Sequence, residues 1–272
     1  MGYIIEFPDF KALKEEVEQL RKDLADLVVQ RDELQCVICK NIEAQYMLEI
    51  GAWEYKAYQT YCTYLRLRRK AELIQVGINR DEPILLDKIE KQLDQEFEDY
   101  QQKLNKQLDK MNAALKRNQM ETLSQDDSQA LKELYRKVVK ALHPDLHPEE
   151  SQQMKELFNR AVIAYESGDL GSIRIIAELV GKTDPDVQAE DSMHMLRKDK
   201  TRLQAMIHDI VVQMDTIKQT YPYTLLKYLE SEIEKQKKLN EIQALQKSYK
   251  EAIKTQKERI TELLGDITWE TL

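Results

Sequence analysis

The sequence predicts an all-α protein in which long helices form antiparallel coiled-coil arms around a small helical module. Gly and Pro, the two residues least compatible with a helix interior, number only 7 and 6 in 272 residues. Glu, Lys, Gln and Leu, which lose little rotamer freedom in a helix, are abundant. Only 4 residues are Phe and 33% are charged, so we expect narrow cores and an elongated shape.

The composition also excludes several classes of function. A formal net charge of −8 argues against nucleic-acid binding, which depends mostly on neutralising phosphates. No apolar run approaches the ~20 residues that span a bilayer, and the N-terminus resembles neither a signal peptide nor a myristoylation site. The 3 Cys, an odd number, do not suggest a disulfide framework. We therefore expect a cytoplasmic protein that does not associate with membranes.

Residues 1–118 are expected to form an N-terminal arm of long helices. Its first half has apolar residues at alternating steps of three and four, the a/d stripe of a coiled coil, with a polar interruption at Arg31. Gly51 leaves open whether residues 9–78 form one helix or two. The stripe consists of Phe10, Leu13, Val17, Leu20, Leu24, Leu27, Arg31, Leu34 and Ile38.

An aromatic stripe follows the coiled-coil stripe on the same arm. We expect these rings to pack against a neighbouring helix rather than to form a binding platform. Residues 77–83 then form a turn, and the next helix repeats its apolar pattern every eleven residues, which predicts one nearly straight helix folding back on the first. The aromatic residues are Trp53, Tyr55, Tyr58, Tyr61 and Tyr64.

Residues 184–272 are expected to form C-terminal coiled-coil helices. The three-four alternation returns over residues 193–217, is interrupted at residues 220–222, and continues more weakly to about residue 264. The apolar seams of both arms must be covered either by each other or by a second chain. The sequence leaves open which of the two occurs, and a homodimer through the arms is one of the possibilities.

Residues 119–183 follow different local rules and predict a module of short helices. An apolar face ending at Leu142 defines one helix, for which Ser124 or Asp126 can serve as the N-cap. Pro144 ends that helix, Pro148 suits the first turn of the next, and Gly168 ends the second helix. Four basic residues lie mostly off the apolar face and form a positive strip in an acidic protein: Lys132, Arg136, Lys137 and Lys140.

The two helices and their loop resemble part of a J-domain, the module of the DnaJ-like co-chaperones. The stretch Leu-Tyr-Arg-Lys-Val-Val-Lys-Ala-Leu-His-Pro-Asp at residues 134–145 is similar to the family's helix II and its His-Pro-Asp loop. Phe158-x-x-Ala161-x-x-Ala164-Tyr165 is similar to helix III. The family's usual helix I has no counterpart before Ser128, and residues 111–120 are expected to cover the open face of the hairpin instead.

The resemblance implies a specialised co-chaperone that binds a DnaK-type chaperone and stimulates its ATPase, with no cofactor and no metal. His143, Pro144 and Asp145 would then be the trigger. The basic strip would steer the hairpin onto an acidic surface of the chaperone. The client protein is not identified. The implied contacts on helix II are Lys132, Tyr135, Arg136, Lys137 and Lys140.

Other candidate sites have simpler explanations. Cys36 and Cys39 could belong to a zinc or redox site, but small buried apolar residues are favoured. The basic run at residues 66–70 is interpreted as a solvated helix face. No phosphate loop, nucleophile elbow or paired-carboxylate site occurs, so we expect no enzyme. The alternative to a co-chaperone is a coiled-coil scaffold whose J-like hairpin does not engage a chaperone.

Overall fold

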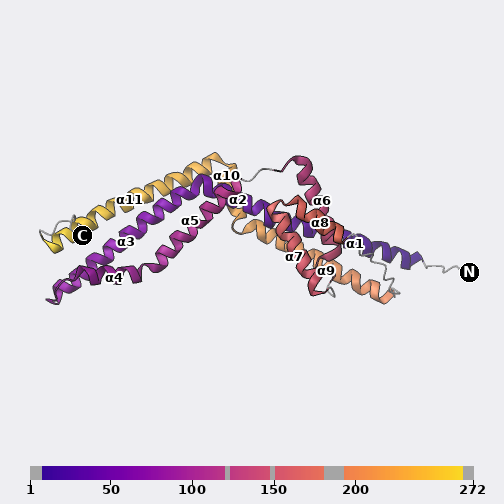
Figure 1. Cartoon of the computed structure of the whole chain (residues 1–272), viewed down its shortest axis with the longest axis horizontal. Helices are drawn as coiled ribbons and strands as arrows, with labels where there is room; N and C mark the ends of the chain where they lie inside the picture. Colours follow the sequence, from indigo (N-terminus) through magenta and orange to yellow (C-terminus); the bar gives the residue numbers. More distant parts are fainter. Residues whose placement is uncertain (1–7, 120–122, 148–150, 181–192, 266–272) are drawn as a thin grey trace, which may run out of the picture. The chain divides into compact units, whose positions relative to one another are not determined.

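The computed structural model describes residues 8–119, 123–147, 151–180 and 193–265 (Figure 1). All the regular elements in these residues are helices, which confirms the all-α prediction. None of the described helices combines the length and the apolar character needed to cross a membrane.

The chain divides into two compact units, each assembled from segments far apart in sequence. The first combines Met1–Asn41 with Glu121–Thr224, and the second combines Ile42–Met120 with Leu225–Leu272. The three consecutive segments expected from the sequence, 1–118, 119–183 and 184–272, do not correspond to these units. Helices pair through contacts between distant parts of the chain, and local sequence patterns do not reveal such pairings.

Helical backbone continues from Pro8 to Asn79. Gly51 has φ −54° and ψ −36°, so the chain does not break there. Two π-helical segments widen the helix, and the first of them shifts the apolar register. Ile38, expected on the stripe, is consequently 38% exposed, whereas Cys36 and Cys39 are buried. The elements are α1 (Pro8–Asp32), η1 (Glu33–Ile38), α2 (Cys39–Tyr46), η2 (Met47–Gly51) and α3 (Ala52–Asn79).

In the first unit, α1 packs along α9 (Met193–Gln219). Beside this packing, Lys200 of α9 forms an ion pair with Glu16 of α1 at 2.6 Å. The two stripes therefore cover each other within one chain. The buried residues on the two helices belong to the same cluster and include Val17, Leu24, Val28, Leu196, Leu203 and Ile210.

The module of short helices consists of α6 (Gln125–Leu142), α7 (Gln152–Ser167) and α8 (Leu170–Val180). Helices α7, α8 and α1 all pack against α6. The expected cover from residues 111–120 is therefore wrong, and Met111 packs in a cluster of the second unit. The α6–α7 pair and its loop are called the hairpin below.

The second unit contains α3 with α4 (Leu86–Glu96), α5 (Glu98–Gln119) and α11 (Glu232–Leu264) (Figure 1). The single helix expected after residue 83 is wrong, because Phe97 leaves helical geometry at φ −103° and ψ 7° and separates α4 from α5. A short η3 (Tyr223–Leu225) and α10 (Leu226–Glu230) precede α11.

Side chains of α3 confirm one expectation for this unit and correct another. Tyr61 lies 5.0 Å from Tyr249 of α11 between ring centroids, and Tyr64 lies 6.2 Å from it, as expected of packing aromatics. The basic run is not simply solvated. It joins α3 to α4 through the ion pairs Arg66–Glu90, Arg66–Asp94, Arg69–Glu96 and Lys70–Glu90.

Candidate partner-binding site

Local sequence signals set both ends of α6. The Ser124 hydroxyl accepts a hydrogen bond from the Asp127 backbone N–H at 3.1 Å, which confirms this serine as an N-cap. At the other end, His143 takes an extended conformation, φ −64° and ψ 128°, which is favoured before a proline. The helix therefore stops one residue before the His-Pro-Asp motif.

The loop of residues 143–147, called the HPD loop below, is organised around His143. The His143 carbonyl accepts hydrogen bonds from the N–H groups of Leu146 and His147, each at 2.9 Å. Its Nδ1 accepts the Asp145 N–H at 3.1 Å, and its ring meets Phe158 of α7 edge-on at 5.1 Å. His143 is thus the internal anchor of the loop.

Burial of His143 determines its protonation. The ring is 4% exposed, and removal from water lowers the pKa of His143 below its ordinary value. The nearby Asp145 carboxylate acts in the opposite direction but does not prevail. Nδ1 must also lack a proton in order to accept the Asp145 N–H. The loop conformation therefore belongs to the neutral imidazole.

Between α6 and α7 the hairpin is held by stacked rings. Tyr135 lies 4.2 Å from Tyr165 with an interplanar angle of 8°, and both rings are buried. Stacking in an offset arrangement adds to the free energy gained by burying the rings. Gly168, at φ 72°, then ends α7 with the left-handed geometry that glycine adopts without strain, as predicted. Pro148, expected in the first turn of α7, lies outside the described residues.

Helix α1 contacts one row of α6 side chains through acidic residues. Tyr135 is 0% exposed and its hydroxyl donates a hydrogen bond to the Asp32 carboxylate at 2.7 Å. Arg31 donates to the other oxygen of that carboxylate at 2.7 and 3.0 Å. Burial and the Asp32 charge raise the pKa of Tyr135, so the hydroxyl keeps its proton.

Two basic residues of α6 flank this buried contact and pair with acidic residues of α1 and of the start of η1. Lys132 forms an ion pair with Glu33, and Arg136 forms one with Asp26 at 3.1 Å. We call Lys132, Tyr135 and Arg136 the α1-facing row. The expectation that Tyr135 contacts a partner is corrected, because its side chain is fully buried and is not accessible to another protein.

The other residues expected in the site lie at the loop end of the hairpin. Lys137 and Lys140 are exposed, and neither has an ion-pair partner among the described residues. Pro144 is partly exposed, and the Asp145 side chain retains 46% of its accessible surface. We call Lys137, Lys140, Pro144 and Asp145 the loop-end surface.

Sequence reasoning missed four residues that shape this site. Asp26 and Asp32 of α1 and Glu33, the first residue of η1, engage the α1-facing row. Arg202 of α9 donates to the Asp145 carbonyl oxygen at 3.4 Å and so ties the HPD loop to another helix. The available signal was the polar interruption of the α1 stripe at Arg31, directly beside Asp32.

The cysteines occupy core positions. Cys36, Cys39 and Cys62 are free thiols and all are buried. Burial, helped by the neighbouring Glu166 carboxylate, raises the pKa of Cys36 to about 12. A thiol that stays protonated is a poor nucleophile and a poor metal ligand. Within the described residues, no cluster of three or more His, Cys, Asp or Glu has the arrangement of a metal site.

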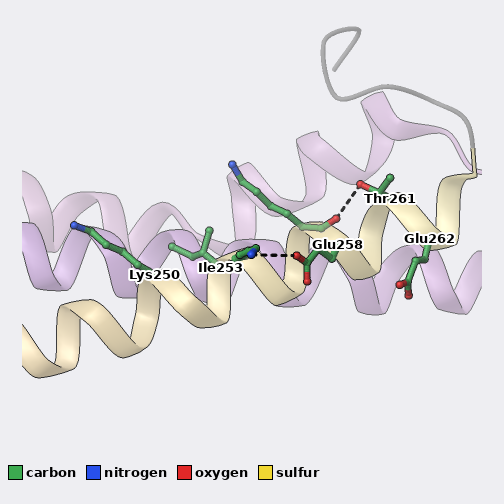
Figure 2. Close-up of a pocket in the computed structure, with 7 residues that line it drawn as sticks. Lys250, Ile253, Glu258, Thr261 and Glu262 are labelled. Atoms are coloured by element: carbon green, nitrogen blue, oxygen red, sulfur yellow. Dashed lines mark hydrogen bonds and ion pairs between the residues drawn. The ribbon is translucent and has the colours of Figure 1, made fainter.

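Figure 2 shows a shallow hollow on α11 in the second unit. All its lining residues come from this one helix, and some of them pair with each other, as in the Lys254–Glu258 ion pair at 3.8 Å. A single helix supplies only one wall, whereas ligand sites bury most of their ligand. This hollow is a solvated helix face.

Comparisons with models of protein families, with curated proteins and with solved structures find no match for this chain.

Proposed function

We propose that the first unit is a J-domain-like co-chaperone module that engages a DnaK-type chaperone through its loop-end surface and stimulates the chaperone's ATPase. The observation that supports this proposal most strongly is that His143 and Asp145 of the His-Pro-Asp motif have different environments. His143 is built into the hairpin core, whereas Asp145 presents a half-exposed carboxylate. A turn that only connects two helices does not require a buried histidine whose ring and carbonyl hold the backbone of the following residues in place.

Charge beside the loop supports the same function. Lys137 and Lys140, in the last two turns of α6 before the HPD loop, are two exposed positive charges with no ion-pair partner among the described residues, in a chain of net charge −8. Such a local reversal of sign steers association with an acidic surface and sets the docking orientation. No group here reacts with ATP. The module would act by binding one state of the chaperone better than another.

A scaffold role is the second candidate, and the α1-facing row favours it. Tyr135 is fully buried, and Lys132 and Arg136 already pair with Glu33 of η1 and Asp26 of α1. Part of the basic strip on this hairpin pairs with other residues of the same chain. Such intramolecular pairing is expected of a structural element, whereas a J-domain keeps its basic face free for the chaperone.

Stimulation of ATP hydrolysis distinguishes the two functions. We expect the full chain to raise the single-turnover ATPase rate of a DnaK-type chaperone from its own host several-fold. Asp145→Asn should abolish the stimulation, since it removes an exposed charge without changing size. Asp215→Asn, on an exposed position of α9, is the matched control and should stimulate as the unaltered chain does.

Circular dichroism of the variants establishes that they fold. A folded chain that gives no stimulation, or an Asp145→Asn variant that stimulates fully, overturns the co-chaperone proposal. Either result would favour the scaffold.

A further inference from the structure

A pocket of about 380 Å³ opens in the first unit beside the HPD loop. Helices α1 and α9, the last turn of α6 and the loop itself all contribute to it. Its volume lies in the lower part of the range of roughly 300–1,000 Å³ that is usual for small-molecule sites. The lining residues are Glu18, Arg21, Lys22, Lys140, Leu146, His147, Arg202 and Leu203.

Positive charge dominates this pocket. Arg21, Lys22, Lys140 and Arg202 face a single lining carboxylate, that of Glu18. Asp199 beside the pocket forms ion pairs with Arg21 at 2.9 Å and with Arg202 at 3.6 Å. Even with both acids counted, an excess of positive charge remains in an acidic protein.

The two lysines carry that excess. Among the described residues, neither Lys22 nor Lys140 has a carboxylate within ion-pair distance. Bringing like charges together costs free energy, which a bound anion recovers. The arginines differ, because Asp199 holds both guanidinium groups in position and Glu18 pairs with Arg21 as well, at 3.0 Å.

Apolar residues also contribute to the lining. Leu203 is 1% exposed, and Leu146 packs against the core of the first unit. An apolar surface lowers the local dielectric constant, which strengthens attraction between the basic side chains and an anion. Arg202 also donates to the Asp145 carbonyl oxygen, so the pocket shares a residue with the support of the HPD loop.

We propose that this pocket binds a small phosphate-bearing anion. Lys22 and Lys140 supply the charge, and Arg21 and Arg202 supply oriented donors. Guanidinium groups match the geometry of phosphate oxygens, and an excess of positive charge suits a multiply charged group. The volume accommodates one compact ligand better than an extended peptide. The site does not depend on the chaperone proposal, since binding is measured on this chain alone.

Calorimetric titration of the full chain with pyrophosphate and, separately, with AMP tests the site. We expect binding that weakens as salt is raised. Lys22→Gln should weaken it about tenfold, because a charge-assisted hydrogen bond is lost. Lys14→Gln, an exposed lysine on the same helix outside the pocket, should bind as the unaltered chain does. Tighter binding of pyrophosphate points to free phosphates, and tighter binding of AMP to nucleotides.

Three results overturn the proposal. The first is failure of both ligands to bind at low salt, and the second is an affinity that Lys22→Gln leaves unchanged. The third is tighter binding of a hexaglutamate peptide than of either phosphate compound, since this would assign the pocket to an acidic protein segment. None of these results bears on ATPase stimulation.

Discussion

The α1-facing row lies on α6, whereas the loop-end surface combines two residues of α6 with two residues of the HPD loop, and the two sets have opposite surroundings. In the α1-facing row, Tyr135 is buried against Asp32 and its basic neighbours pair with acidic residues of α1 and η1. In the loop-end surface, Lys137 and Lys140 are exposed, and the Asp145 side chain is half-exposed. A strip of like charge on one helix can therefore serve two purposes, joining the hairpin to its own chain and leaving a surface free for a partner.

Substitutions of Tyr135 should have the largest effect among the changes that test this contrast. Tyr135→Ala should destabilise the first unit by about 4 kcal/mol, the usual cost of deleting a buried aromatic ring. Tyr135→Phe should cost roughly 1.5–3 kcal/mol, because it removes a hydrogen bond to the buried Asp32 carboxylate. Hydrogen exchange of the α6 backbone amides measures both effects in the first unit alone.

Tyr165 is the matched control for the second of these changes. It stacks on Tyr135, but its buried hydroxyl has no hydrogen-bond partner among the described residues. Tyr165→Phe should therefore change the free energy of unfolding by less than about 0.5 kcal/mol, or stabilise the unit. Equal losses for the two Tyr→Phe changes would show that α1 does not engage Tyr135 as described.

His143 makes the stability of the hairpin depend on pH. Its pKa is lowered in the folded chain, whereas the unfolded chain titrates near the ordinary value of about 6.5. As pH falls through about 6.5, His143 binds a proton in the unfolded state but not in the native state, so the free energy of unfolding decreases. The loss amounts to about 1.4 kcal/mol for each unit between the two pKa values and ceases below the folded pKa.

Urea titrations between about pH 5.5 and 7.5 measure this dependence. His143→Asn should flatten it, because an amide oxygen can still accept the Asp145 N–H but does not titrate. His208→Asn, at an exposed position on α9, should leave the slope as it is. A slope that persists without His143 would contradict the assignment of the neutral ring.

Sequence patterns predicted the hairpin but not its surroundings. Capping, proline and glycine signals act within a few residues, so the ends of α6 and the end of α7 followed from Ser124, Pro144 and Gly168. The contact between Asp32 and Tyr135 joins residues 103 positions apart, and no local rule specifies it. The same applies to the placement of Arg202 beside the HPD loop.

Departures from helical geometry explain two places where the sequence pattern predicts the wrong helical register. The stripe of α1 predicts a buried Ile38, but the wider helical turn of η1 leaves this residue exposed. The eleven-residue repeat predicts a helix that continues through Phe97, where α4 ends. Periodicity identifies a helix well, but it does not reveal a single residue that departs from helical geometry.

The division of α6 into two functional rows is tested most directly by two double variants in the chaperone ATPase assay. Lys137→Gln with Lys140→Gln should raise the concentration of this protein needed for half-maximal stimulation about tenfold, because exposed steering charges are lost. Lys132→Gln with Arg136→Gln should change it less than about twofold, since those charges already pair with Glu33 of η1 and Asp26 of α1 and exposed pairs contribute little. Equal effects of the two variants, or a larger effect of the second, would contradict the account.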